Sequence, residues 1–375
     1  MAAKLFEELT IPTRAGNGVQ LKNRAIVAPM CQYSVTERDG VPNDWHLMHY
    51  GAFAAGGFGL VTVESTAVEA RGRISPLDLG LWDDGQIAEH RHIVDFMHSL
   101  GAKTAVQLGH AGGKAATPPW FPGESGATLS EDEGGWEVVS STDQPIFEGM
   151  AAPHQLSTDE IKDVIAAFAA AARRADEAGY DAIQLHGAHG YLIHQFLSPV
   201  TNQRTDEYGG SEENRTRFVR EVLQAVADVW PREKVLGIRI SGTDWLEETD
   251  QPGWTVEESA RLIRTLREES GLTWVDVSSG GLTDGKTIPI GFGYQTPLAQ
   301  HMLNELADTD VVVTTVGMID SAVQAESILR THQAHGISFA RTALGNPHWA
   351  THAALELRVP KEKLPNAVQL WRARF

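Results

Sequence analysis

The strongest constraint on the fold is a repeat of short β-branched runs, each followed by a longer segment with the spacing of an amphipathic helix. A strand, a helix and a further strand in succession form the unit from which parallel sheets are built. Eight units of this kind in one chain of 375 residues predict a single-domain α/β protein, a (β/α)8 TIM barrel. The predicted strands are Ala25–Ala28, Leu60–Glu64, Lys103–Leu108, Ala182–Leu185, Val235–Ile240, Trp274–Ser278, Val311–Val316 and Gly336–Ala340.

The alternative α/β architecture, a doubly wound sheet, fits the chain less well. Such sheets typically have five or six strands and carry a GxGxxG turn after the first of them. That fingerprint follows none of the predicted strands. The glycine-rich stretch Gly51–Gly59 precedes the second strand, so it predicts a helix end and a tight turn rather than a phosphate loop.

Three segments lie outside the repeat. Residues 1–24 precede the first strand and are expected to form a hairpin that plugs the bottom of the barrel. Residues 112–155 follow the third strand, and a loop of that length predicts a lid or capping insertion. Residues 360–375 form a C-terminal tail. Among the predicted helices, Ser157–Ala178 and Ser211–Val229 each begin with a capping serine and an acidic first turn.

Composition narrows the classes of function. The formal net charge of −18 argues against nucleic acid, which requires a concentrated basic surface. Cys31 is the single cysteine, so the chain's own thiolates cannot hold an iron–sulfur cluster or a cysteine-rich zinc site. The longest apolar run, Val164–Ala172, is too short to span a bilayer, and the N-terminus has no apolar signal core. We expect a cytoplasmic protein without membrane or metal, whose redox work needs an organic cofactor.

Polar residues gather at the predicted C-terminal ends of the strands, where the active sites of TIM barrels lie. Gly317 and Arg341 follow the seventh and eighth strands, where barrels commonly bind a phosphate. Gln107 can donate to and accept from the edge of a pyrimidine-like ring. Arg239 stays cationic and can stabilise negative charge on a reduced ring. This set predicts an FMN cofactor, which performs the hydride chemistry while the protein orients it.

The stretch LHGAHGYLIHQFLSP, residues 185–199, places two histidines and a tyrosine on one bend after the fourth strand. His186 and His189 can each donate an N–H to a carbonyl or nitro oxygen and so polarise a conjugated C=C bond. Hydride then adds at the β carbon, and Tyr191 can deliver a proton to the α carbon. The constellation predicts the reduction of activated alkenes.

Four motifs resemble the Old Yellow Enzyme family of FMN-dependent ene-reductases, and specifically its thermophilic-like class. They are APMCQY at 28–33, QLGHAG at 107–112, HGAHGYLIHQFLSP at 186–199 and NQRTDEYGGSEENRTRF at 202–218. The resemblance covers essentially the whole chain. It implies a ping-pong reduction of enones, enals, maleimides or nitroalkenes with hydride from NADPH or NADH, in which nicotinamide and substrate occupy one pocket in turn.

The resemblance also implies roles by position. Tyr191 is the expected proton donor, His186 and His189 bind the substrate oxygen, and Tyr33 touches the substrate. Arg372 is expected to reach the active site of a neighbouring subunit, in a homodimer or a dimer of dimers. Cys31 is expected near the flavin N5 edge, where it tunes the potential. Together with the strand-end argument, the expected FMN contacts are Ala28, Pro29, Met30, Cys31, Ser65, Gln107, Arg239, Gly317, Ala340 and Arg341.

Three positions depart from the pattern of the family. Ala340 replaces a glycine before the phosphate arginine, and its methyl group restricts the approach of the backbone. Gly113 replaces an arginine after QLGHAG, so any ion pair at that position is absent. Leu370 replaces a tyrosine close to the C-terminal arginine, which bears on the contact between subunits.

Simpler interpretations stay open for the residues that carry chemistry. An isolated HxxH pair is more often structural, and His186 and His189 could instead belong to a metal-dependent TIM-barrel hydrolase with a zinc site. Arg239 could pair with Asp244 or Glu247 instead of facing a cofactor. A non-catalytic flavin-binding or ligand-binding protein is the third possibility.

Other polar residues are interpreted as architectural. Arg204, Asp206 and Arg215 are expected to form a buried polar network that fixes the loop after the fourth strand. His194 is expected to be structural. Cys31 could be a small buried residue without a redox role.

Overall fold

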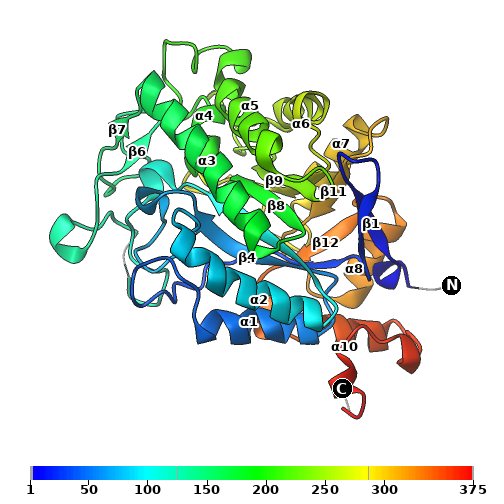
Figure 1. Cartoon of the computed structure of the whole chain (residues 1–375). Helices are drawn as coiled ribbons and strands as arrows, with labels where there is room; N and C mark the ends of the chain where they lie inside the picture. Colours follow the sequence, from blue (N-terminus) through cyan, green and yellow to red (C-terminus); the bar gives the residue numbers. More distant parts are fainter. Residues whose placement is uncertain (1–2, 125, 286, 374–375) are drawn as a thin grey trace.

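Eight parallel strands close into a barrel that helices surround, as Figure 1 shows. The computed structural model describes residues 3–124, 126–285 and 287–373, so the extreme ends of the predicted plug and tail lie outside the described residues. The (β/α)8 prediction is confirmed, and the order around the barrel is β10-β11-β12-β3-β4-β5-β8-β9. The barrel strands are β3 (Ala25–Val27), β4 (Leu60–Ala67), β5 (Lys103–Gly109), β8 (Ala182–Gly187), β9 (Val235–Ser241), β10 (Trp274–Ser278), β11 (Val312–Thr315) and β12 (Gly336–Phe339).

Helices join the strands, and their ends follow the predicted signals. Ser157 accepts a hydrogen bond from the backbone N–H of Glu160, and Ser211 accepts one from that of Asn214, so both predicted caps are confirmed. Within the described ranges, none of the helices combines the length and the apolar character that crossing a membrane requires. The helices are α1 (Asp44–Ala55), α2 (Ile87–Ser99), α3 (Thr158–Ala178), α4 (Leu192–Leu197), α5 (Glu212–Val229), α6 (Val256–Ser270), α7 (Thr296–Glu305), α8 (Ala322–Arg330), α9 (Arg341–Gly345) and α10 (Trp349–Glu356).

The interior of the barrel changes from apolar to polar along its axis, because alternate residues of each strand point inward. The apolar layer lies at the start of the strands and consists of Ile26, Leu60, Ala105, Ala182, Val235, Trp274 and Val312. Two or four residues further along, the same strand faces carry buried polar side chains. These are Gln107, Gln184, Arg239, Asp276, Thr314 and Ser338. The polar layer therefore lies beneath the C-terminal mouth of the barrel.

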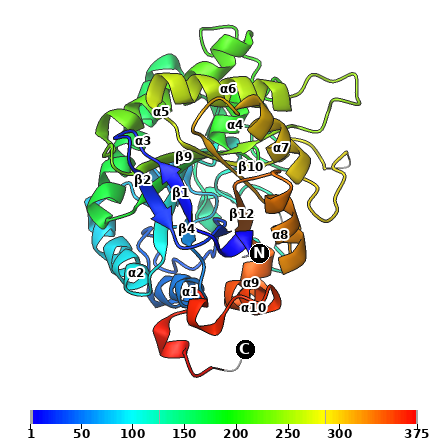
Figure 2. The same cartoon turned by 90° about the vertical axis from the view of Figure 1, so that its right-hand side faces the viewer.

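An N-terminal hairpin lies across the other end of the barrel (Figure 2). Its strands β1 (Leu9–Pro12) and β2 (Gly18–Leu21) pair antiparallel. Leu9, Ile11 and Leu21 pack on the apolar layer of the barrel. These packed apolar side chains close this end of the barrel interior, and the polar layer is at the opposite, C-terminal end.

The segment between β5 and α3 extends from the barrel on the side away from the hairpin (Figure 1). It contains the short strands β6 (Val139–Ser140) and β7 (His154–Gln155), which pair parallel. The ring of Phe121 meets that of Tyr33 edge-on, with centroids 6.0 Å apart. Trp136 packs on the small apolar cluster that also contacts Cys31 and Tyr191. The segment thus lies against the side of the mouth that carries the predicted catalytic residues.

The side chain of Asp181, directly before β8, is a mostly buried carboxylate that accepts several hydrogen bonds. Asp181 accepts hydrogen bonds from His98 (2.6 Å), Lys103 (2.8 Å) and the backbone of Thr104 (2.9 Å). Burial raises the pKa of Asp181, but these donors outweigh burial and hold it at about 2, below the ordinary 3.8. The carboxylate therefore stabilises the fold above pH 4, and this contribution is lost as the pH falls towards 2.

We expect Asp181→Asn to lower the free energy of unfolding by about 2 kcal/mol at pH 7, measured by urea denaturation. The deficit should shrink as the pH falls from 5 to 3, because the carboxyl group of the unfolded wild-type chain, with its ordinary pKa of 3.8, protonates there while the folded one stays ionised. Asp159→Asn is the control, since its side chain is 90% exposed and pairs with Lys162, which is itself exposed. A deficit that stays constant down to pH 3 would contradict the assigned pKa.

Candidate active site at the C-terminal mouth of the barrel

A cavity of about 490 Å³ opens where strands β9 to β12 end. Its lining includes Arg239, Gly317, Ala340 and Arg341 from the sequence prediction. Gly317 has a φ of 122°, and a Cβ there would lie 2.7 Å from Gln295 Nε2, so this position requires glycine. Ala340 has a φ of −105°, so alanine in place of glycine introduces no left-handed strain at this position.

The remaining predicted cofactor residues end the neighbouring strands β3, β4 and β5. Ser65 lies at an irregularity of the β4–β5 pairing. Gln107 donates a hydrogen bond from Nε2 to Gln184 Oε1 at 2.9 Å. Burial raises the pKa of Cys31 well above 9.0, so this side chain is a thiol rather than a thiolate. Six of the predicted FMN contacts do not line the cavity, namely Ala28, Pro29, Met30, Cys31, Ser65 and Gln107.

The structure brings the two predicted histidines and the tyrosine together. The ring centroid of His186 is 5.2 Å from that of His189 and 4.8 Å from that of Tyr191. Burial and the charge of Arg239 hold the pKa of both histidines well below 6.5, so both imidazoles are neutral. Burial raises the pKa of Tyr191 well above 10, so its phenol keeps the proton. The cluster is a set of neutral hydrogen-bond donors.

Hydrogen-bond partners assign the proton positions on both rings. His186 Nδ1 faces the backbone N–H of Ala188 at 3.4 Å, which leaves the proton on Nε2. His189 Nε2 lies 2.7 Å from Ser278 Oγ, and Ser278 Oγ lies 3.3 Å from Gln295 Oε1, which only accepts. The Ser278 hydroxyl therefore donates to Gln295 and accepts from His189 Nε2–H. His186, His189 and Tyr191 do not line the cavity themselves, and His189 is joined to it through Ser278, which does.

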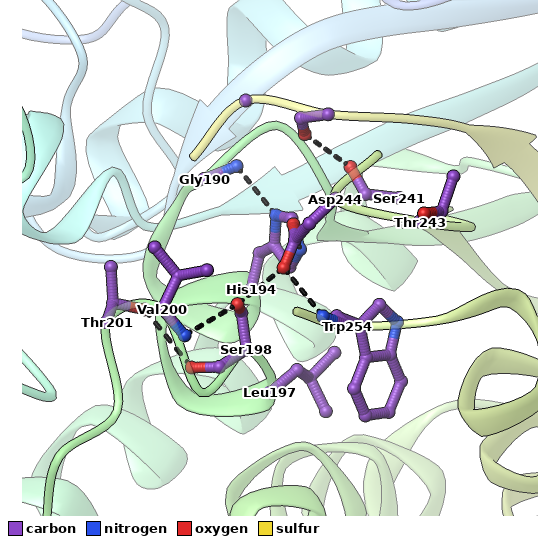
Figure 3. Close-up of polar contacts among 12 residues, drawn as sticks. Gly190, His194, Leu197, Ser198, Val200, Thr201, Ser241, Thr243, Asp244 and Trp254 are labelled. Carbon is purple, nitrogen blue, oxygen red and sulfur yellow. Dashed lines mark hydrogen bonds and ion pairs between the residues drawn. The ribbon is translucent and has the colours of Figure 1, made fainter. Parts of the chain in front are cut away.

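A buried histidine–aspartate pair holds the turn that carries these residues (Figure 3). The backbone N–H of Gly190 donates to His194 Nδ1 at 2.9 Å, and His194 Nε2 lies 3.1 Å from Asp244 Oδ1. Asp244 Oδ2 accepts from Ser198 Oγ and from the backbone N–H of Trp254. The pair keeps Gly190 in place beside His189, which has a φ of 60°. His194 is structural, as the sequence indicated.

Lys114 is a member of the site that the sequence reasoning missed. Its Nζ donates to the carbonyl oxygens of His189 (2.7 Å) and Gly281 (3.1 Å) and lies 5.0 Å from the ring centroid of Tyr191. Burial lowers the pKa of Lys114 to about 8. The ammonium group ties the histidine turn to the loop after β10 and places positive charge over the phenol ring.

The alternative ion pairs considered for Arg239 do not form. Arg239 pairs with neither Asp244 nor Glu247, because its Nε lies 3.1 Å from Asp276 on the adjacent strand. The carboxylate of Asp244 pairs with His194, and the carboxylate of Glu247 accepts a hydrogen bond from the hydroxyl of Thr243.

The predicted network around Arg204 is only partly right. Arg204 pairs with Asp206 at 2.5 Å, but Arg215 pairs with Glu258 of α6 at 2.7 Å. Arg215 also donates from Nε to the carbonyl oxygen of Leu197 at 2.9 Å. Its role is therefore to link the loop after β8 to the neighbouring helix.

The histidine pair does not resemble a metal centre. Among residues 3–124, 126–285 and 287–373, no group of three or more His, Cys, Asp or Glu side chains is arranged to hold a metal ion. The charges of Arg239 and Lys114 lower the pKa of both His186 and His189, and the same positive charges repel a cation. The geometry gives the hydrolase alternative no support.

Comparison with known proteins identifies the family of the chain. The model of the NADH:flavin oxidoreductase / NADH oxidase family matches residues 4–359. The chain belongs to this family, the Old Yellow Enzyme family. It is 41% identical to an NADPH dehydrogenase of a Geobacillus species over 357 residues, 95% of each chain. It is 40% identical to an NADPH dehydrogenase of Listeria welshimeri over 355 residues, also 95% of each.

A solved structure agrees with this assignment. Morphinone reductase in complex with tetrahydroNAD is similar with a TM-score of 0.74 and 27% identity, over 95% of this chain and 92% of that one. The resemblance that the four motifs indicated is thereby confirmed. As a member of the Old Yellow Enzyme family, the chain is an oxidoreductase that uses FMN and NAD(P)H.

The residues of this Old Yellow Enzyme chain fit FMN. Gln184 Nε2 is buried without a hydrogen-bond partner among the described residues, and it lies beside Gln107 in the polar layer. A buried amide N–H group of this kind needs an acceptor, which a ring carbonyl or ring nitrogen provides. Arg239 is buried in the wall of the cavity, and Arg341 is exposed at its rim. Donors for both the ring and the phosphate are thus present.

The structure also shows the environment of two further positions from the sequence analysis, Arg372 and Gly113. Arg372 is exposed in the C-terminal tail and does not line the cavity of its own chain. The tail contacts α1, because the backbone N–H of Ala367 donates to the carbonyl oxygen of Ala55 at 3.0 Å. A Cβ at Gly113 would lie 2.8 Å from Cγ1 of Ile146 in the lid segment, so a larger residue at this position would require Ile146 to move.

Proposed function

We propose that this protein is an ene-reductase that takes hydride from NADPH or NADH and reduces activated alkenes by a ping-pong mechanism. The substrate classes are enones, enals, maleimides and nitroalkenes. The observation that carries the proposal is the cluster of two neutral imidazoles and a protonated phenol, with ring centroids 4.8 and 5.2 Å apart, next to the cavity. Bound FMN would supply the hydride chemistry that links the nicotinamide of NAD(P)H to the β carbon of the alkene.

The FMN would span the mouth of the barrel. Arg341 and the backbone at Gly317 would hold the phosphate, since both line the cavity where β11 and β12 end. Gln107, Gln184 and Arg239 would contact the polar edge of the ring from the layer below. The opposite edge would lie against Ser65 of β4 and the segment after β3, that is Ala28, Pro29, Met30 and Cys31.

The residues after β8 would bind and protonate the substrate. His186 and His189 would donate their Nε2–H groups to its carbonyl or nitro oxygen, and the bond from His189 would replace the one to Ser278. Tyr191 would give its proton to the α carbon. The Lys114 ammonium group, 5.0 Å from the ring centroid, would stabilise the phenolate that remains.

The lid and the tail complete the proposed enzyme. Tyr33 would touch the substrate, and its contact with Phe121 would let the lid segment exclude water from the mouth. Arg372, exposed on its own chain, would enter the site of a neighbouring subunit in a homodimer or dimer of dimers. We propose the cytoplasm as the location.

Two-stage kinetics test this function. The purified protein is mixed anaerobically with NADPH, which should bleach the flavin absorbance, and cyclohexenone is then added, which should restore it. Steady-state double-reciprocal plots at several enone concentrations should give parallel lines, because donor and acceptor never bind together. A reduced flavin that cyclohexenone and N-ethylmaleimide both fail to reoxidise would contradict the proposal.

A further inference from the structure

Asp276 is a buried carboxylate that joins four neighbouring barrel strands directly beneath the cavity. On β10 it lies in register with Arg239 of β9 and Thr314 of β11. Its Oδ2 is 3.1 Å from Arg239 Nε, and its Oδ1 accepts hydrogen bonds from Thr314 Oγ1 and Ser338 Oγ, both at 2.7 Å. One carboxylate therefore binds side chains from β9, β11 and β12.

The ion pair changes the charge that a ligand in the cavity experiences. The side chain of Arg239 is 6% exposed and that of Asp276 is fully buried, so water screens neither charge. Arg239 uses its Nε edge for Asp276, while the guanidinium also lines the cavity. A ligand in the cavity would therefore face the guanidinium of Arg239, whose positive charge is partly compensated by the carboxylate of Asp276 on its other side.

Compensation of this kind matters for a flavin, because reduction adds negative charge to the ring. A lone buried guanidinium would stabilise the reduced form strongly and raise the reduction potential. A flavin with a high potential would accept hydride readily but would be a weak donor to an alkene. The carboxylate behind the guanidinium opposes that effect, and it also restrains the direction in which the guanidinium points.

We propose that Asp276 is a positioning residue for Arg239 that also lowers the reduction potential of the bound FMN by compensating the charge of the guanidinium. This inference rests on the FMN-dependent reaction proposed above. It assigns a role to a residue that contacts neither cofactor nor substrate and acts on the chemistry only through Arg239.

Asp276→Asn tests the proposal, because asparagine keeps the shape and can still accept from Thr314 and Ser338 while it removes the charge. The readout is the midpoint potential of the bound FMN, measured anaerobically against a reference dye. We expect the equilibrium constant for flavin reduction to rise at least tenfold, which is about 30 mV for a two-electron couple. Reduction by NADPH should become faster and reoxidation by cyclohexenone slower.

Thr314→Val is the matched control. It removes one hydrogen bond to the same carboxylate, and one from Trp274 Nε1, but it leaves the charge of Asp276 in place. It should lower the thermal stability of the barrel without moving the potential. If both variants lose stability and neither moves the potential, Asp276 has only a structural role and the proposal is wrong.

Two further outcomes are distinguishable. If Asp276→Asn does not accumulate as folded protein, Asp276→Ser takes its place with the same expected direction of shift, because serine is smaller and still polar. An unchanged or lowered potential in the folded, FMN-bound variant overturns the role of Asp276. Wild-type protein that binds no FMN would instead refute the proposed function, and the inference would fall with it.

Discussion

Tyr191→Phe is expected to slow reoxidation of the reduced flavin by cyclohexenone about 10²- to 10⁴-fold, the usual contribution of a positioned proton donor. Reduction of the flavin by NADPH should be largely unchanged, because that step moves hydride and does not use the phenol. The structural reason is that Tyr191 is protonated and packs against His186, with ring centroids 4.8 Å apart. Anaerobic stopped-flow absorbance measures the two half-reactions separately.

Tyr33→Phe provides the matched control for this experiment. Tyr33 is a second phenol near the mouth, and it packs against Phe121 of the lid segment rather than against His186. Its loss should affect substrate binding more than the rate of proton transfer. Equal slowing of both half-reactions in Tyr191→Phe would mean that the residue supports the site structurally and is not the donor.

The double variant His186→Ala/His189→Ala should weaken the binding of a phenol ligand such as p-hydroxybenzaldehyde by at least about 100-fold. Two hydrogen bonds to a charged oxygen, at about 1.5 kcal/mol or more each, account for a loss of that size. Because both imidazoles are neutral, any pH dependence of binding between pH 6 and pH 8 should follow the ionisation of the phenol ligand and not that of a histidine. The perturbation of the flavin spectrum by the ligand gives the dissociation constant.

Asparagine at the same two positions separates hydrogen bonding from packing. His186→Asn/His189→Asn keeps an N–H donor in each side chain, so it should recover a large part of the affinity that alanine loses. Alanine variants that bind the phenol as tightly as the wild type would remove both histidines from the oxygen-binding role. Equal losses in the alanine and asparagine variants would point to a packing role instead.

The elements of the fold that depend on local pattern could be predicted from the sequence. Each predicted β-branched run overlaps a barrel strand, and the serines at 157 and 211 cap their helices, because burial periodicity and capping chemistry act over a few residues. The sequence also predicted that Arg239, Gly317 and Arg341 lie around one cavity, because each of them ends or follows a barrel strand. In a barrel, the ends of all parallel strands meet at one face.

The partners of the site residues could not be predicted in this way. Asp276 is inside a predicted strand, and a charge there is a sign of a buried ion pair, but the sequence does not say that Arg239 lies across from it. Ser278 and Gln184 are ordinary polar residues until the barrel register places them beside His189 and Gln107. Lys114 follows a turn with no periodic pattern, so nothing local indicated its contact with the turn of His189.

We expect FMN to lie across the barrel mouth with the donor edges of His186 and His189 facing its ring. A crystal structure of the protein with FMN and a bound phenol tests this most directly. We predict the ring edge within hydrogen-bond distance of Arg239 and Gln107, the phosphate at Arg341, and the phenol oxygen bound by His186 and His189. A flavin bound elsewhere, or a phenol that neither imidazole contacts, would contradict the account.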